Sequence, residues 1–275
     1  MSARNRIFGL LLACLAALTP CARAQGGPPF ITDDPGTPGN RQWEVNLLWT
    51  GNHNPGSSSY QLPDVDINYG LGERLQLKFE LPLAAATDAH RTTRAGVGES
   101  QLGIKWRYFE HHTAGLPKSD ETLRFSLGTF PQLVLNNPTS SVRRGIVETG
   151  PQYYLPVEFT ARLGPLRING EVGRWIGNRH VSGRWGRGLI AGHEFSQNFE
   201  LFGELYDLQD IQRIGGDPKA RQFTAGLGGR RSLGRDNRVR LLFMGGRSLQ
   251  RVSRTNGEPN WIACLGMQFL LGTKK

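Results

Sequence analysis

The sequence predicts an all-β fold, a transmembrane antiparallel β-barrel of about 12 strands with long loops at one end and short turns at the other. Three observations lead to this fold class. The N-terminus has the composition of an export signal. The rest of the chain alternates apolar and polar residues with a period of two. Long and short connections alternate between the resulting segments, as they do in barrels that cross an outer membrane.

Residues 1–24 form the predicted signal peptide. Two arginines precede an apolar run over residues 7–18, and residues 22–24 (Ala-Arg-Ala) form a small-x-small cleavage site. The apolar run is too short to cross a bilayer as a helix, which takes about 20 residues. Lipid attachment at Cys14 is an alternative that the short apolar stretch before it disfavours. We therefore expect export to the outer membrane of a Gram-negative cell.

Removal of the signal changes the charge and the cysteine content. Three of the 33 basic residues and two of the three cysteines would leave, so that the net charge becomes +7 (+10 − 3) and only Cys264 remains. Internal disulfides are then excluded, and no catalytic partner for Cys264 is visible. Export argues against a nucleic-acid partner, so the expected anionic partner is lipopolysaccharide in the outer-membrane lipid.

Residues 25–41 are rich in Gly and Pro and have no strand period, so we expect an irregular segment that either hangs below the barrel or enters its lumen. The barrel domain is predicted over residues 42–275. Its clearest strand places Leu75, Leu77, Phe79 and Leu81 on one face and polar residues on the other. Twelve such strands are predicted, over residues 42–50, 61–69, 74–82, 97–109, 121–135, 145–160, 166–176, 184–195, 199–209, 220–231, 237–249 and 260–271.

Some segments fit this pattern poorly. Pro131, Pro151 and Pro156 fall inside predicted strands, and since proline cannot donate to a ladder we expect bulges or breaks there. Neither face of residues 184–195 is clearly apolar, so the register of that strand is not predicted.

The connections differ in charge as well as in length. The six long ones, over residues 51–60, 83–96, 136–144, 177–183, 210–219 and 250–259, carry nine basic and four acidic residues. The five connections at the other end, over residues 70–73, 110–120, 161–165, 196–198 and 232–236, carry three basic and four acidic residues, and all but 110–120 are short. The basic excess would lie against lipopolysaccharide phosphate, although a solvated loop surface has the same composition.

Charged residues on the inward parity of the strands are the predicted lining of the lumen and the candidate substrate path. They are Asp64, Asp66, Arg74, Lys78, Glu80, Glu99, Lys105, Arg107, Arg124, Glu148, Glu171, Glu200 and Glu204. Both signs occur on adjacent strands, which allows either a polar path or an interior that pairs its charges and seals itself.

Aromatic residues near strand ends are predicted to form interfacial girdles. They are Trp43, Trp49, Tyr69, Trp106, Tyr108, Phe109, Tyr153, Trp175, Trp185 and Trp261. The alternative for some of them is a place along the path of an aromatic solute.

No cofactor site, metal site or catalytic residue is assigned. Adjacent side chains on extended backbone point apart, so His111 and His112 do not chelate together. His180 and Ser182 have the spacing of the His-x-Ser pair found in outer-membrane lipid hydrolases, in which the histidine accepts the serine proton. A lipid hydrolase is therefore an alternative function, and a solvated loop is the simpler interpretation of the pair.

Three stretches, PFITDDPGTPGNRQWEVN, LPDVDINYGLGERLQLKFELPL and GVGESQLGIKWRYF, resemble an outer-membrane β-barrel family named for the MetA pathway of phenol degradation and described as transporters. The resemblance is strongest over residues 29–109, and the later strands match mainly in pattern. It implies a passive channel or uptake protein for small hydrophobic or aromatic molecules. A sealed structural or surface-binding barrel is a further alternative.

Overall fold

The structure, a computed structural model, describes residues 27–113, 123–136, 139–177, 183–211, 221–234, 236–250 and 260–272. The predicted signal peptide and the pair His180 and Ser182 lie outside these residues. None of the helices in the described part of the chain has the length and hydropathy that a bilayer-spanning helix needs.

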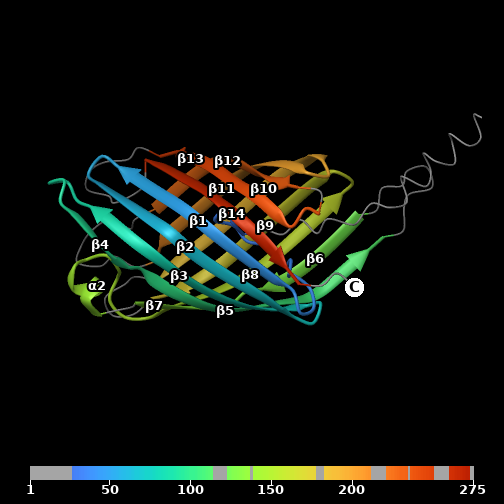
Figure 1. The fold of residues 1–275 in the computed structure, drawn as a ribbon, viewed down its shortest axis with the longest axis horizontal. Coiled ribbons are helices and arrows are strands. Elements are labelled where there is room, and N and C mark those ends of the chain that lie inside the picture. Colours follow the sequence, from blue (N-terminus) through green and yellow to red (C-terminus); the bar gives the residue numbers. More distant parts are fainter. Residues whose placement is uncertain are drawn as a thin grey trace, which may run out of the picture.

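The described chain is a single antiparallel sheet that closes on itself (Figure 1). Its elements are β1 (Trp43–Asn54), β2 (Ser57–Leu71), β3 (Leu75–Thr87), β4 (Thr93–Val97), β5 (Glu99–His112), β6 (Leu123–Thr129), β7 (Gln132–Asn136), α2 (Thr139–Arg143), β8 (Gln152–Leu163), β9 (Leu166–Ile176), β10 (Arg184–Ser196), β11 (Phe199–Asp210), β12 (Arg221–Leu233), β13 (Val239–Ser248) and β14 (Trp261–Leu271).

The 14 strand segments make 12 strands of the barrel. β4 and β5 both pair with β3 and are interrupted only at Gly98, and β6 and β7 both lie between β5 and β8. Counting each pair once gives 14 − 2 = 12 strands. The predicted barrel of about 12 strands is confirmed.

Closure comes from β1 and β14, which pair antiparallel from Trp43 opposite Leu271 to His53 opposite Trp261. No edge is left unpaired between these two strands, as lipid requires, because the hydrocarbon core offers no water to an unpaired N–H or C=O group.

The strands separate an apolar exterior from a polar interior. On β3, Leu77 and Phe79 are more than 40% exposed, whereas Gln76, which points to the opposite face of the sheet, is buried. On β14, Leu265 points outward, and Cys264 and Gln268 are buried inside. Large apolar side chains exposed around a whole barrel indicate a lipid-facing surface.

The aromatic girdles lie at both ends of this apolar band. Toward the long connections, Trp49 stacks on Tyr60 with ring centroids 6.4 Å apart, and Trp261 stacks on His53. Toward the short connections, Trp43 lies 4.5 Å from Tyr69.

The prolines mark the irregular part of the wall. Pro131 separates β6 from β7, and Pro156 of β8 lies opposite that break, where its carbonyl accepts a hydrogen bond from the Thr129 hydroxyl at 2.6 Å. The prediction of a strand over residues 145–160 is wrong at its start, because β8 begins at Gln152. Gly145 and Gly150 have positive φ values, and Pro151 has no N–H to give to a ladder.

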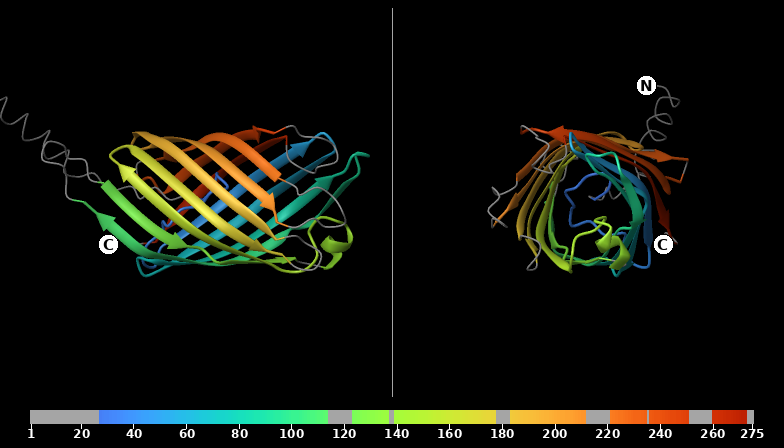
Figure 2. Two further views of the ribbon diagram at one scale, coloured as in Figure 1. Left: turned by 180° about the vertical axis from the view of Figure 1, so that it is seen from behind. Right: turned by 90° about the vertical axis from the view of Figure 1, so that its left-hand side faces the viewer.

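Two predicted long loops are mostly strand. β1 and β2 continue to a tight turn at residues 55–56, where the Asn54 side-chain oxygen accepts the backbone N–H groups of Gly56 and Ser57. β3 and β4 likewise continue to residues 87 and 93. These hairpins extend the barrel wall at the end where α2 lies (Figure 2).

Candidate functional site

The lumen is crossed by an irregular segment, residues 27–40, which we call the strap. It lies inside the ring of strands in the end-on view of Figure 2. Of the two predicted placements for this part of the chain, the structure shows the one inside the barrel. Gly and Pro keep the strap out of the sheet, and Asp34 caps its turn by accepting the Gly36 N–H at 2.8 Å.

The strap is fixed at the short-turn end of the barrel. The Arg41 N–H donates to Gly70 O at 2.8 Å, and the Thr37 hydroxyl donates to Glu73 O at 2.8 Å. Contact between the two segments is so close that a Cβ at Gly70 would lie 1.8 Å from the carbonyl oxygen of Gly39.

A buried lysine holds the middle of the strap. Lys105 of β5 is 1% exposed, and its ammonium donates to Asp33 Oδ1 and to Asp34 O, each at 2.7 Å. The same ammonium lies 4.6 Å from the centre of the Phe130 ring. A charge this deeply buried requires such partners, because burial removes its hydration.

The far side of the strap contacts the strands of the second half of the chain. Thr32 N donates to Glu204 Oε1 at 2.7 Å and Asp33 N donates to Glu171 Oε2 at 3.1 Å. Arg230 of β12 donates to the carbonyls of residues 27 and 28. Phe30 packs edge-on against Phe202 with ring centroids 5.8 Å apart, within an apolar cluster that includes Cys264.

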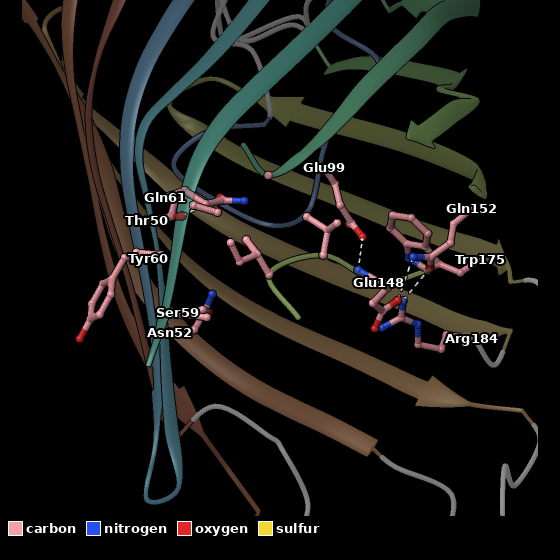
Figure 3. Close-up of a pocket in the computed structure, with 16 residues that line it drawn as sticks. Thr50, Asn52, Ser59, Tyr60, Gln61, Glu99, Glu148, Gln152, Trp175 and Arg184 are labelled. Carbon is pink, nitrogen blue, oxygen red and sulfur yellow. Dashed lines mark hydrogen bonds and ion pairs between the residues drawn. The ribbon is translucent and has the colours of Figure 1, made fainter. Parts of the chain in front are cut away.

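Beside the strap lies a chamber of about 460 Å³, bordered by residues 27–31 of the strap itself. A second hollow of about 320 Å³ lies toward the long connections (Figure 3). Both are lined by Thr50, Asn52, Gln61, Trp175 and Arg184, so the two hollows adjoin.

One wall of the chamber is charged. Lys78 lies 2.6 Å from Glu80 Oε2 and 3.9 Å from Asp66, and Asn46 donates to Asp66 at 2.9 Å. Asp64, on the same wall, also lines the chamber.

The opposite wall is aromatic. Tyr154 stacks on Trp175 with ring centroids 4.4 Å apart, and its hydroxyl donates to the Glu171 carboxylate. The Tyr206 hydroxyl lies on the same side of the chamber, near Trp175 Nε1. The three rings meet over Gly186, where a Cβ would lie 3.0 Å from the Tyr206 hydroxyl and 3.2 Å from that of Tyr154.

The structure places most of the predicted lining residues on the inside of the barrel. The chamber or the strap is contacted by Asp64, Asp66, Lys78, Glu80, Lys105, Glu171 and Glu204. Glu99 lines the outer hollow and accepts the Glu148 N–H. Arg107 donates to Glu73 O, and Glu200 lies 3.7 Å from Arg167.

Two predicted lining residues lie elsewhere. Arg74 is exposed in the turn before β3. Arg124 has the inward parity, but the hairpin of β5 and β6 projects beyond the neighbouring strands, so its side chain is exposed (Figure 1). Glu148 belongs to the connection before β8 and not to a strand, but it lines the outer hollow beside Glu99, 3.8 Å from Arg184.

The sequence does not predict the aromatic wall as a unit. Its pattern assigns Trp175 to a girdle, but the side chain lines the chamber, which is the alternative that the sequence leaves open for some aromatic residues. Tyr154 and Tyr206 alternate in step with charged residues that point into the lumen on the same strands. This shared period of two is the sequence signal that would place both tyrosines inside the barrel. The register of residues 184–195 is not predictable from the sequence because several of its inward positions are glycines and not polar residues. These glycines make room for Tyr154, Tyr206 and the strap residue Thr32.

No group of three or more His, Cys, Asp or Glu side chains in the described ranges is arranged to hold a metal ion. Arg144, one of the basic residues of the long connection over residues 136–144, donates to the Ala95 carbonyl and lies against Gly96 of the wall.

A closed 12-strand barrel with an apolar exterior, aromatic girdles and a polar interior defines an outer-membrane β-barrel. Among solved structures, the chain is similar to an outer membrane channel from Pseudomonas putida F1, with a TM-score of 0.60 and 14% identity over 89% of this chain and 99% of that chain. It is also similar to the NanC porin, with a TM-score of 0.53 and 5% identity over 82% and 98% of the two chains. No protein-family model and no curated protein matches the sequence.

The contact between Gly70 and Gly39 leads to the first prediction. Gly70→Ala forces a methyl group against a backbone carbonyl that cannot rotate away, so we expect a loss of about 1–3 kcal/mol in the free energy of unfolding. Urea unfolding of the detergent-folded protein measures it. Gly245→Ala is the matched control, because nothing lies within 4 Å of the added Cβ. Equal stability of the two variants would contradict the close contact.

The second prediction concerns Lys105. Lys105→Met leaves the carboxylate of Asp33, whose side chain is only 17% exposed, without its partner. Breaking a buried pair costs about 3–5 kcal/mol. We expect the amides of residues 32–37 to exchange their hydrogens faster, as measured by hydrogen exchange and mass spectrometry. Arg162→Gln, which removes an ion pair with Glu194 away from the strap, should leave that exchange unchanged. Unchanged protection in Lys105→Met would show that the strap is held by other contacts.

Proposed function

We propose that this protein is a passive outer-membrane channel for small molecules, and that aromatic or hydrophobic solutes cross it through the chamber beside the strap. The observation that carries the proposal is the chamber itself, which adjoins a hollow at the barrel mouth. A structural barrel has no need of such a space, since it can fill its lumen with side chains.

The two walls of the chamber support a path for small aromatic solutes. The rings of Tyr154, Trp175 and Tyr206 offer faces on which an aromatic solute can stack. Across the chamber, Asp64, Asp66, Lys78 and Glu80 offer hydrogen-bonding groups that keep the path wetted. The sequence resemblance to barrels named for phenol degradation supports the same solute class, and the two similar solved structures are titled a channel and a porin.

A sealed barrel is the second candidate function, because the strap crosses the lumen and is hydrogen-bonded on both sides. The two candidates differ in one measurable property. A channel conducts ions in a planar bilayer, and a sealed barrel does not. The absence of conductance from protein that shows the mobility shift of a folded barrel on a gel would contradict the proposal.

The third prediction tests the aromatic wall. Trp175→Ala removes a stacking face, which is worth about 0.5–1.5 kcal/mol. We therefore expect a roughly 2- to 10-fold lower flux of an aromatic solute relative to a sugar of similar size, measured by liposome swelling. Ionic conductance should rise, because the path widens.

Trp185→Ala is the matched control for this experiment. Trp185 of β10 lies opposite Arg174, the residue next to Trp175 on β9, but its side chain is exposed on the outside of the barrel. It should leave the flux ratio unchanged. An unchanged ratio in Trp175→Ala as well would show that aromatic solutes do not cross along this wall.

A further inference from the structure

Four arginines project from the outer surface of the barrel at one end, where the long connections lie. Arg174, Arg187, Arg221 and Arg247 lie on β9, β10, β12 and β13, and we call them the arginine patch. They alternate with residues that face the lumen, so their side chains point outward. The only acidic side chain among the outward positions described on β9–β13 is Asp207 of β11, so the patch has a net charge of +3.

We propose that the arginine patch binds the phosphate groups of lipopolysaccharide in the outer leaflet. The position of the patch along the strands supports this ligand. Two residues nearer the middle of the wall than Arg174, Arg187 and Asp207, the outward side chains are Val172, Leu189 and Leu205, all between 44% and 51% exposed. The arginines therefore lie at the edge of the lipid-facing band, at the depth where the phosphorylated sugars of a lipid meet its acyl chains.

The patch occupies one side of the barrel. On β1, β2 and β14 the described chain has no lysine or arginine at all, and the outward residues at this end include Trp49, His53 and Tyr60. A belt of basic residues that served only to keep the barrel at the membrane surface would run around the whole wall. Concentration on five adjacent strands indicates a site for a particular ligand.

Asp207 holds the side chains of two arginines of the patch next to each other. Its carboxylate is about 10% exposed and accepts from Arg187 Nη1 at 3.0 Å and from Arg221 Nε at 2.6 Å, while both guanidinium groups are about half exposed. Each guanidinium has five N–H donors, so each keeps donors directed away from Asp207. Two planar forks held side by side match the bidentate geometry that phosphate accepts.

Two arginines of the patch also lie over aromatic rings. The Arg174 guanidinium lies 5.5 Å from the Trp185 ring. Arg221 similarly lies over Phe223 at 5.6 Å.

A second copy of this chain is a poorer occupant of this surface. An isologous contact would bring the patch against itself, and three net positive charges on each side repel. Free phosphate would gain nothing from the apolar side chains directly below the arginines, whereas acyl chains on the same molecule would pack on them.

The test is the affinity of the full-length protein, folded in detergent, for lipid A, measured by native mass spectrometry with diphosphorylated and fully dephosphorylated lipid A. We expect the wild-type protein to prefer the phosphorylated lipid. The double variant Arg187→Gln/Arg221→Gln should bind the phosphorylated lipid at least tenfold more weakly, because each lost bond is charge-assisted, and should bind the dephosphorylated lipid as the wild type does. Inorganic phosphate at the same concentration should not compete.

Arg231→Gln is the matched control, because Arg231 is exposed on the outer surface of β12 near the opposite end. It should retain the wild-type affinity. Heat-dependent gel mobility establishes that each variant is folded. Equal binding of phosphorylated and dephosphorylated lipid A by the wild type, or an unchanged affinity in the double variant, would overturn the proposal. So would a change of oligomeric state in the double variant, which would assign this surface to a second copy.

Discussion

The antiparallel pairing of β1 with β14 closes the barrel. A strand edge in hydrocarbon leaves a row of N–H and C=O groups without partners, so the sheet is stable in lipid only if its first and last strands meet. Closure gives the sheet an inner and an outer face. Because side chains alternate between the two faces, each strand residue then points either into the lumen or toward the lipid. The apolar exterior, the girdles, the polar lumen and the arginine patch all follow from this division.

The strap determines what the lumen can do. A polar interior of 12 strands would be an open aqueous path, but residues 27–40 cross it and divide it. The strap is possible because the wall provides both space and charge where it passes. Gly70 and Gly188 leave room for Gly39 and Thr32, and Lys105 compensates Asp33. The chamber that remains has one face formed by the strap itself, so movement of the strap would change its size.

The sequence predicts the features that depend on local periodicity. The alternation in β3 and β14, the class of fold and most of the inward charges could be predicted because each strand has its own apolar face. Features that depend on distant contacts could not. The place of the strap depends on residues more than 70 positions away, and Trp175 differs from Trp185 only in which face of the sheet it occupies. The start of β8 was missed because the backbone requirements of Gly145 and Gly150 are not visible in an apolar pattern.

Closure and register can be tested together by a single substitution. Thr50 of β1 lies directly opposite Cys264 of β14, and both side chains are on the luminal side. Paired residues on antiparallel strands have Cα atoms about 4.5–5.5 Å apart, which is within the range for a disulfide. In Thr50→Cys we expect oxidation to link the two ends of the barrel, giving a boiled, non-reduced band that migrates differently from the reduced one. Leu47→Cys, which points outward, should form no link. Failure of the folded Thr50→Cys variant to form the disulfide under oxidising conditions would contradict the closed barrel in this register.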